Sequence, residues 1–305
     1  MAKVIKIITW NINGSQNPVK RKKWLSYLKT HQTDIALIQE THMEGKEADK
    51  LKRDWVGQVF HNSYSSKKNG VAILVHKRLN LVMLNQKKDD EGRMICIHAA
   101  IDGVKINICN VYAPNRDDSN FFHMVNKTLG ELDDAQTVIG GDFNQVQDAH
   151  LDRTTYHKTV PKDRLAIQLM MKDHGLVDIW RLVNPREKEY TFFSHVHKSH
   201  SRIDYFLVSR KSTEMVGDCK IGAIALSDHA PVELIVKLKS SRSTGNRWRL
   251  NASLLQDPTF KTSLDIYLRD FFDLNVGSTK RIASVWEASK AYIRGYLISQ
   301  SSYRK

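Results

Sequence analysis

Polar side chains that could take part in a reaction recur at the ends of short β-type runs. Gly140-Gly141-Asp142-Phe143-Asn144 follows one such run, and Ser227-Asp228-His229 precedes another. A single Asp or Asn after a strand is usually a turn residue that bonds its own backbone. Several polar strand ends of compatible chemistry are hard to explain as independent turns. We therefore interpret the following residues as one site: Asn11, Glu40, Tyr112, Asp142, Asn144, Asp204, Asp228 and His229.

The residue types of this site suit metal-assisted hydrolysis of a phosphodiester. Mg²⁺ prefers one or two carboxylates and keeps its waters for phosphate oxygens, which predicts Glu40 and Asp228 as ligands from separate strand ends. We expect Mn²⁺ to be able to replace it. Asp142, placed by Asn144, could deprotonate or orient the attacking water.

Phosphodiester hydrolysis also needs hydrogen-bond donors at the phosphate oxygens. His229, held protonated by Asp204, would supply positive charge as negative charge develops. Asn11 and Tyr112 would add neutral donors.

Composition narrows the class of protein. The 305 residues carry 47 Lys and Arg against 33 Asp and Glu, and this net charge of +14 attracts polyanions such as nucleic acid. Three cysteines without a CxxC motif predict neither a disulfide framework nor a zinc site, and fit a reducing compartment. The apolar stretch at the N-terminus is too short for a signal peptide, and no run of apolar residues approaches the ~18 residues of a membrane span. We predict an intracellular protein with no membrane partner.

Strands and helices alternate up to about residue 239. Nine runs rich in β-type residues predict strands, and four amphipathic segments predict helices at 18–30, 46–53, 118–131 and 161–174. So many strands exceed one open sheet, so we expect two stacked sheets with helices outside. The predicted strands are Val4–Thr9, Asp34–Gln39, Gly70–His76, Met94–Ala100, Val104–Val111, Thr137–Ile139, Tyr190–Phe193, Ile203–Val208 and Val232–Leu238.

The chain changes character after this region. Residues 240–250 have the composition of a linker, and 251–305 contain two helix-like stretches, about 258–272 and 279–298. We therefore predict a first domain over 1–239 and a helical extension over 251–305. Residues 241–305 carry 11 Lys and Arg against 5 Asp and Glu.

The ordered motifs resemble the endonuclease/exonuclease/phosphatase superfamily. The phrases ITWNING, IQETH, NVYAPN, GGDFN, YTFFS, SRIDYFLVS and SDHAPV most resemble the apurinic-like endonuclease domain of LINE-type non-LTR retrotransposons. That resemblance implies a DNase I-like α/β fold: a four-layer sandwich of two stacked, mainly antiparallel sheets flanked by helices, here with a C-terminal helical extension. The extension would be the start of the segment that leads to a reverse transcriptase.

The resemblance also implies an activity. Such an enzyme nicks one strand of double-stranded target DNA and leaves a 3′-hydroxyl that primes reverse transcription. Glu40 and Asp228 would hold the metal, and Asp142 and Asn144 would position the water. The extension could contact the element's RNA. We expect a monomeric fragment, made in the cytoplasm and active in the nucleus.

The same resemblance assigns supporting and DNA-contacting residues. Thr191 and Ser227 would contact phosphate or the network around it. The loop 194–201, a hairpin between two site strands, would touch DNA beside the scissile bond, although a solvated turn is the alternative. The residues predicted to bind substrate are Thr191, Ser227, Arg202, His195, His197, Lys198, Asn115 and Arg153.

Two features of the sequence and the choice of function leave questions open. After Asn11, repair-type relatives tend to carry Asp where this chain has Asn13, which removes one carboxylate from the metal site. Lys20-Arg21-Lys22-Lys23 could serve phosphate binding or nuclear import, or could form a solvated helix face. Two alternative functions remain: an abasic-site repair endonuclease of the same superfamily, and a non-catalytic basic nucleic-acid-binding module.

Overall fold

The chain folds into two compact units. The computed structural model describes residues 3–155, 160–238, 252–277 and 282–303. The first unit is Met1–Ser241 and the second is Arg242–Lys305. The predicted linker over 240–250 lies outside the described residues.

The first unit contains two six-stranded sheets. One has the order β13-β14-β1-β2-β4-β3, in which only the β1–β2 pair is parallel. Its strands are β1 (Lys3–Asn11), β2 (Ile35–Gln39), β3 (Gly57–Asn62), β4 (Val71–His76), β13 (Val216–Ile221) and β14 (Val232–Leu238).

The other sheet has the order β5-β6-β7-β8-β12-β9, and here only the β7–β8 pair is parallel. Its strands are β5 (Leu81–Lys88), β6 (Met94–Ile101), β7 (Val104–Tyr112), β8 (Gln136–Asp142), β9 (Leu176–Asp178) and β12 (Asp204–Ser209). A separate hairpin pairs β10 (Phe192–Ser194) with β11 (Ser199–Ser201).

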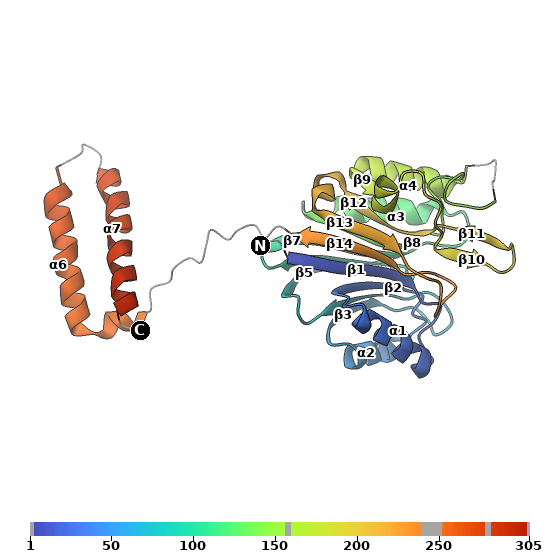
Figure 1. Ribbon diagram of the computed structural model, residues 1–305, viewed down its shortest axis with the longest axis horizontal. Helices are drawn as coiled ribbons and strands as arrows, with labels where there is room; N and C mark the ends of the chain where they lie inside the picture. Colours follow the sequence, from blue (N-terminus) through green and yellow to red (C-terminus); the bar gives the residue numbers. More distant parts are fainter. Residues whose placement is uncertain (1–2, 156–159, 239–251, 278–281, 304–305) are drawn as a thin grey trace. The chain divides into compact units, whose positions relative to one another are not determined.

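Helices cover the outer face of each sheet. α1 (Pro18–Thr30) and α2 (Gly45–Asp54) lie against the first sheet (Figure 1). Their buried Trp24, Leu28 and Leu51 belong to the cluster beneath them. α3 (Ser119–Gly130) and α4 (Lys162–Asp173) pack on the second sheet. A short helix α5 (Ile179–Val183) and a 3₁₀ helix (Arg210–Met215) complete the unit. These layers confirm the predicted four-layer sandwich.

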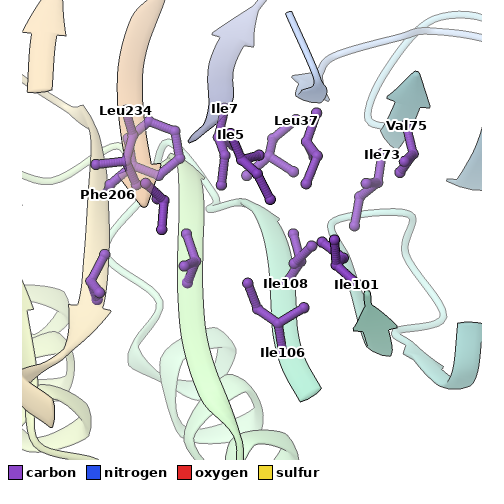
Figure 2. Packing of buried hydrophobic residues seen from close by; sticks show 14 of the residues in the cluster. Ile5, Ile7, Leu37, Ile73, Val75, Ile101, Ile106, Ile108, Phe206 and Leu234 are labelled. Atoms are coloured by element: carbon purple, nitrogen blue, oxygen red, sulfur yellow. The ribbon is translucent and has the colours of Figure 1, made fainter. Parts of the chain in front are cut away.

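The main core lies between the two sheets. Ile5, Ile7 and Leu37 of the first sheet face Ile106 and Phe206 of the second, and all are fully buried (Figure 2). Because successive strand residues point to opposite faces, the remaining apolar positions pack under the outer helices. Ile8, Trp10 and Ile38 do this beneath α1 and α2.

Two glycines allow the sheets to approach closely before Asp142. A Cβ on Gly140 would lie 2.5 Å from the Phe206 ring and 2.7 Å from a Leu37 methyl group. A Cβ on Gly141 would lie 1.9 Å from the carbonyl oxygen of Val111 on the neighbouring strand. The pair therefore lets β8 run between its neighbours and deliver Asp142 at its end.

The strands without a predicted counterpart are β3, β5, β9 and β13, together with β11 inside the predicted hairpin loop. The first four are the edge strands of the two sheets. Edge strands bury one side incompletely and carry polar residues, as in β5, where most residues after Leu81 are exposed. Their hydrophobic pattern is correspondingly weak.

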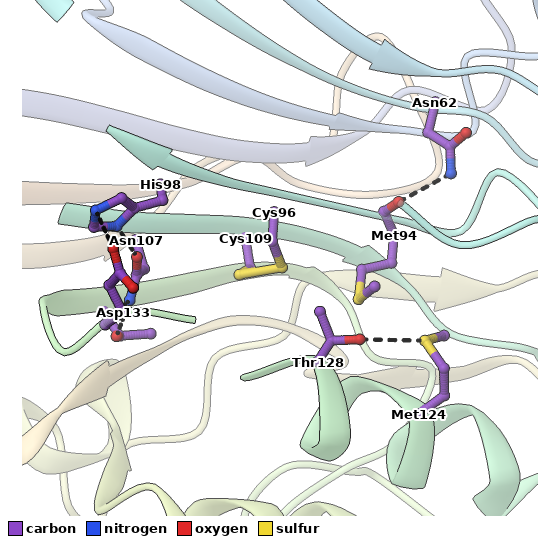
Figure 3. Close-up of a disulfide and its surroundings, with 10 residues drawn as sticks. Asn62, Met94, Cys96, His98, Asn107, Cys109, Met124, Thr128 and Asp133 are labelled. Atoms are coloured by element: carbon purple, nitrogen blue, oxygen red, sulfur yellow. Dashed lines mark hydrogen bonds and ion pairs between the residues drawn. A yellow bond between two sulfur atoms is a disulfide. The ribbon is translucent and has the colours of Figure 1, made fainter. Parts of the chain in front are cut away.

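Cys96 and Cys109 form a disulfide, which corrects the prediction that these cysteines are unpaired (Figure 3). The two residues are direct partners in the antiparallel β6–β7 ladder. The two cysteines are 13 residues apart in sequence, and this spacing alone does not predict that they pair. The pairing can be inferred only when the register of the ladder is known. Cys219 is free and buried.

The second unit is a helical hairpin. A 3₁₀ turn (Ala252–Gln256) leads into α6 (Pro258–Asn275), which packs against α7 (Ile282–Tyr303). The Tyr267 ring stacks on the rings of Tyr292 and Tyr296, each with centroids 4.2 Å apart. Over the described residues, neither these helices nor any other is long and apolar enough to cross a membrane.

Candidate active site

The polar strand ends of both sheets meet in one cleft. The cleft has a volume of about 680 Å³. Its walls contain eight of the residues predicted for catalysis, metal or substrate: Glu40, Tyr112, Asn115, Asp142, Asn144, Arg153, Asp228 and His229. His197 of the predicted DNA-contacting loop also lines it.

His229 and Asp204 form a buried pair beside the cleft. Nδ1 of His229 lies 2.8 Å from Oδ2 of Asp204, and both residues are at most 5% exposed. Burial lowers the pKa of His229, but the charges of Asp204 and Asp142 outweigh it and raise that pKa to about 10. The imidazole is therefore a protonated donor at neutral pH.

Backbone contacts hold His229 in place. Its carbonyl oxygen accepts a hydrogen bond from the Trp10 indole at 3.0 Å, and its N–H donates to Ser227 Oγ at 3.3 Å. Its backbone forms an isolated bridge with Phe192, whose ring lies 4.7 Å from the imidazole. The start of β10 therefore supports the histidine from one side.

Asp142 lies close to this pair and carries a perturbed carboxyl group. Its Oδ2 is 3.8 Å from Nε2 of His229 and accepts a hydrogen bond from Asn11 Nδ2 at 2.9 Å. Burial and the neighbouring Asp204 charge raise the pKa of Asp142 to about 7, against the lowering effects of His229 and Asn11. A carboxyl group with such a pKa can exchange a proton near neutrality.

Asn11 connects Asp142 to Glu40. The same Nδ2 that contacts Asp142 also donates to Oε1 of Glu40 at 2.9 Å. Burial would raise the pKa of Glu40, but hydrogen bonds from His42, Asn11 and Tyr112 outweigh it and lower that pKa to about 2. Glu40 is therefore ionised throughout the physiological range.

The backbone turns sharply at several of these strand ends. Asn13, Glu40, His42 and Asn144 all have left-handed conformations, with φ between 46° and 50°. Asn tolerates this region, whereas Glu and His pay a strain of roughly 1–3 kcal/mol that the surrounding structure must offset. Asn144 is fixed further by hydrogen bonds from its N–H to Asp142 Oδ1 and from its Nδ2 to the Ala113 carbonyl, both at 2.8 Å.

The donor set of the cleft fits a hard divalent cation. Glu40 is ionised, and Asp228 lines the same cleft with an oxygen that accepts from Ser227 at 3.1 Å and from Asn13 at 3.3 Å. Carboxylate oxygens of this kind are what Mg²⁺ and Mn²⁺ prefer. Among the described residues, Asp142, Asp204 and His229 also bring ligand atoms within 4.8 Å of one another. Protonation of His229 makes that second cluster the poorer metal site.

Arg202 and Thr191 need correction as substrate contacts. Both side chains are fully buried. Arg202 pairs with Asp152 at 2.9 Å and with Asp178 at 2.7 Å, so its charge is used inside the protein. Thr191 Oγ1 accepts hydrogen bonds from the N–H groups of Ile203 and Asp204 at 3.1 Å. Thr191 therefore orients the strand that carries Asp204.

The predicted DNA-contacting loop is the β10–β11 hairpin. His195 and Lys198 lie at its exposed tip, with His195 edge-on to the Phe193 ring at 4.9 Å, while His197 reaches the cleft. Arg153 lies across from it and forms a backbone bridge with Ser201. The structure thus places hairpin and arginine on the same rim of the cleft.

Several residues outside the predicted set of site residues also lie near the site. His42 pairs with Glu40 at 3.1 Å between Nε2 and Oε2, and Lys20 donates to the Asn13 carbonyl at 2.7 Å. A buried Gln39–Asn110 hydrogen bond of 2.6 Å joins the two sheets behind the cleft. His42 and Gln39 flank Glu40 in sequence, which was the one hint available. Lys20 lies nine residues beyond Asn11, and only the fold returns it to the cleft.

Comparison with known proteins defines the class to which this fold and site belong. Residues 8–229 match the model of the Endonuclease/Exonuclease/phosphatase family. The chain belongs to this family, which confirms the predicted resemblance and the prediction of an enzyme of this class.

Two curated relatives illustrate the range of the family. The chain is 29% identical over 269 residues to an uncharacterized 149 kDa protein of transposon TX1 from Xenopus laevis, covering 85% of this chain and 20% of that protein. It is 30% identical over 260 residues to an exodeoxyribonuclease from Bacillus subtilis, covering 77% of this chain and all of that protein. The chain thus spans about a fifth of the transposon protein.

Solved structures share the fold at lower identity. An AP endonuclease from Leishmania major superposes with a TM-score of 0.66 at 21% identity, over 77% of this chain and 88% of its own. The 3′ phosphatase NExo from Neisseria, bound to a product DNA hairpin, has a TM-score of 0.62 at 24% identity, over 75% and 98% of the two chains. These likenesses confirm the DNase I-like architecture.

Proposed function

We propose that this protein is a divalent-metal-dependent endonuclease that nicks one strand of double-stranded DNA and leaves a 3′-hydroxyl end. The observation that carries the proposal is the continuous polar network of the cleft. It runs from Glu40 through Asn11 to Asp142, and from Asp142 past His229 to Asp204, with contacts of 2.8–3.8 Å. One ionised carboxylate, one carboxyl group that titrates near neutrality and one protonated imidazole match the needs of phosphodiester hydrolysis.

Each group in the network has a role in this scheme. Asp142 would accept a proton from the attacking water, which Asn144 helps to position. His229 would donate to a non-bridging phosphate oxygen, where negative charge grows as the water attacks. Glu40 and Asp228 would hold Mg²⁺ or Mn²⁺, which when bound supplies Lewis-acid stabilisation of the phosphate and leaving oxygen. Tyr112, whose pKa burial and the Glu40 charge raise, stays a neutral donor.

The sequence relative in a transposon supports a proposal for the wider biological role. The matched stretch covers 85% of this chain, more than the nuclease family match alone. We infer that the nick primes reverse transcription by a downstream part of a longer protein, with action in the nucleus. Residues 241–305, which carry a net charge of +6, could hold the element's RNA.

The test is nicking of supercoiled plasmid by the whole chain. Mg²⁺ should give open circles with 3′-hydroxyl and 5′-phosphate ends, and EDTA should abolish them. His229→Ala and Asp142→Ala should each lower the rate by at least about 100-fold, because acid–base and charge-stabilising groups contribute on that order. Circular dichroism would verify that both variants are folded.

A substrate comparison separates this proposal from its alternatives. An oligonucleotide with a single abasic site should be cut no faster than an intact duplex of the same sequence. Strong preference for the abasic duplex would instead indicate a repair endonuclease. A folded wild type that binds DNA in Mg²⁺ without cutting it would indicate a binding module.

A further inference from the structure

The basic run at the start of α1 separates into residues with different environments. Arg21 is buried and bonds Asp54 at 3.0 Å and the Ser15 carbonyl at 3.1 Å, so it anchors α1 to the rest of the layer. Lys22 and Lys23 are exposed. Lys20 is half-buried and points back toward the end of β1. The run is therefore not one uniform basic surface.

Lys20 is linked to the predicted metal ligands by a short chain of contacts. Its Nζ donates to the carbonyl oxygen of Asn13 at 2.7 Å, and the Asn13 side-chain amide donates to Asp228 Oδ1 at 3.3 Å. Partial burial lowers the pKa of Lys20, and the negative charges of Asp228 and Glu40 oppose that lowering. One lysine on the α1 side thus interacts electrostatically with both carboxylates.

The position of Lys20 needs an electrostatic explanation. It lies in the first turn of α1, three residues after the capping Asn17, where the helix dipole disfavours a cation. The charges of Asp228 and Glu40 oppose that cost and stabilise the ammonium group in part. Conversely, the lysine supplies a positive charge to the metal site on the side where Asn13, rather than Asp, contributes no negative charge.

We propose that Lys20 is a built-in counter-cation of the Glu40–Asp228 pair, which lowers the affinity of the cleft for divalent cations and limits it to one. This inference rests on the proposed metal-dependent function and adds a residue to its site. Two carboxylates and one ammonium leave a single net negative charge, and a second divalent ion would meet an adjacent ammonium. Lys20 acts through the metal site and is a positioning residue.

Metal titration of the whole chain without DNA tests the inference. Mn²⁺ binding would be measured by calorimetry, and by electron paramagnetic resonance of the free ion, for wild type, Lys20→Met and Lys20→Arg. Lys22→Met is the matched control, since it removes the same charge from an exposed position two residues away. We expect one Mn²⁺ site in the wild type, unchanged affinity in Lys22→Met and Lys20→Arg, and roughly five- to tenfold tighter binding in Lys20→Met.

The opposite result identifies a purely structural lysine. If Lys20 only fixed the Asn13 turn, its loss would loosen Asp228 and weaken Mn²⁺ binding, so weaker or unchanged affinity in Lys20→Met overturns the inference. A second variant, Asn13→Asp combined with Lys20→Met, should accept a second Mn²⁺, and a stoichiometry that stays at one would also count against it. Plasmid nicking separates the two proposals: unchanged metal affinity in Lys20→Met with active wild type refutes only the role of Lys20, whereas a wild type that binds no Mn²⁺ refutes both.

Discussion

At the scale of single residues, a buried cluster of charges around Arg202 holds the base of the β10–β11 hairpin. Arg202 bonds Asp152 through two nitrogens at 2.9 Å and lies over the Trp180 and Tyr205 rings at 5.1 and 5.3 Å. Its backbone N–H also donates to the Asp152 carbonyl at 2.8 Å. The neighbouring Arg153, on the rim of the cleft, therefore owes its position to residues buried inside the protein.

Arg202→Met should destabilise the protein by about 3–5 kcal/mol, because it removes the arginine partner of buried Asp178 and one of the two arginine partners of buried Asp152. Urea denaturation of the two proteins would measure this difference. Lys211→Met is the control, since the Lys211–Asp134 pair is exposed and its loss should change stability little. Equal effects of the two substitutions would contradict a buried network.

Asn11→Asp should reduce plasmid nicking by about 100-fold or more while the fold is retained. The substitution replaces the amide that donates to Glu40 and Asp142, both at 2.9 Å, with a third carboxylate of the same shape. Single-turnover rates with Mg²⁺ would measure the effect, and Asn126→Asp, at a half-buried position of α3 beside Asp173, is a control for a carboxylate added outside the cleft. Full activity in Asn11→Asp would show that the network is not needed for catalysis.

At the scale of elements, α3 and α4 cap one another. Asp117, just before α3, accepts hydrogen bonds from the N–H groups of Lys162 and Asp163 at the start of α4. Asp163 in turn accepts from the N–H of Asp118. Burial, together with the charges of Asp117 and Asp118, raises the pKa of Asp163 from 3.8 to about 6. The contribution of the neutral Asp163 to stability is therefore complete below pH 3.8 and is lost as pH rises through about 6.

Asp163→Asn should raise Tm at pH 8 by about 2–4 °C, the effect of roughly 1 kcal/mol in a domain of this size. An amide can still accept from Asp118 and carries no charge to repel its neighbours. At pH 4.5 the difference from wild type should be small, because the native carboxyl is then mostly protonated. Thermal melts at the two pH values test this, and a gain that does not depend on pH would argue against the repulsion.

The β10–β11 hairpin presents an exposed tip beside the cleft. We expect replacement of residues 195–198 with Asn-Gly, which suits a two-residue hairpin turn, to preserve Tm and plasmid nicking while changing where nicks fall. Mapping nick positions by primer extension would measure the change. An unaltered cleavage map would assign the tip to solvent alone.

At the scale of the whole molecule, charge governs encounter with DNA. Residues 241–305 contribute +6 of the net charge of +14. Because each neutralised phosphate adds about −0.9 to the slope of log affinity against log salt, DNA contacts by the helical hairpin would steepen this dependence. Residues 1–241 alone should therefore show a shallower slope than the whole chain. Fluorescence anisotropy in EDTA between 50 and 200 mM salt would measure both, and equal slopes would place the hairpin off the DNA.

The sequence by itself determined the architecture and most of the cleft. Runs rich in β-type residues predicted the central strands, and polar residues at their ends marked Glu40, Asp142 and His229. Local pattern suffices there because each strand end carries its own signal in adjacent residues. Edge strands escaped prediction since their apolar pattern is weak.

Only the tertiary structure decided contacts that depend on register and on the return of distant segments. The pairing of Cys96 with Cys109 requires the β6–β7 register. Arg202 looked like a DNA contact by its place beside Asp204, yet the packing of Asp152 and Asp178 around it uses its charge inside the protein. Lys20 lies near the predicted metal ligands because α1 packs on the sheet that contains β1, which brings the start of the helix close to the end of that strand. Electrostatic interactions act through space, so their partners were set by the fold and not by neighbours in the chain.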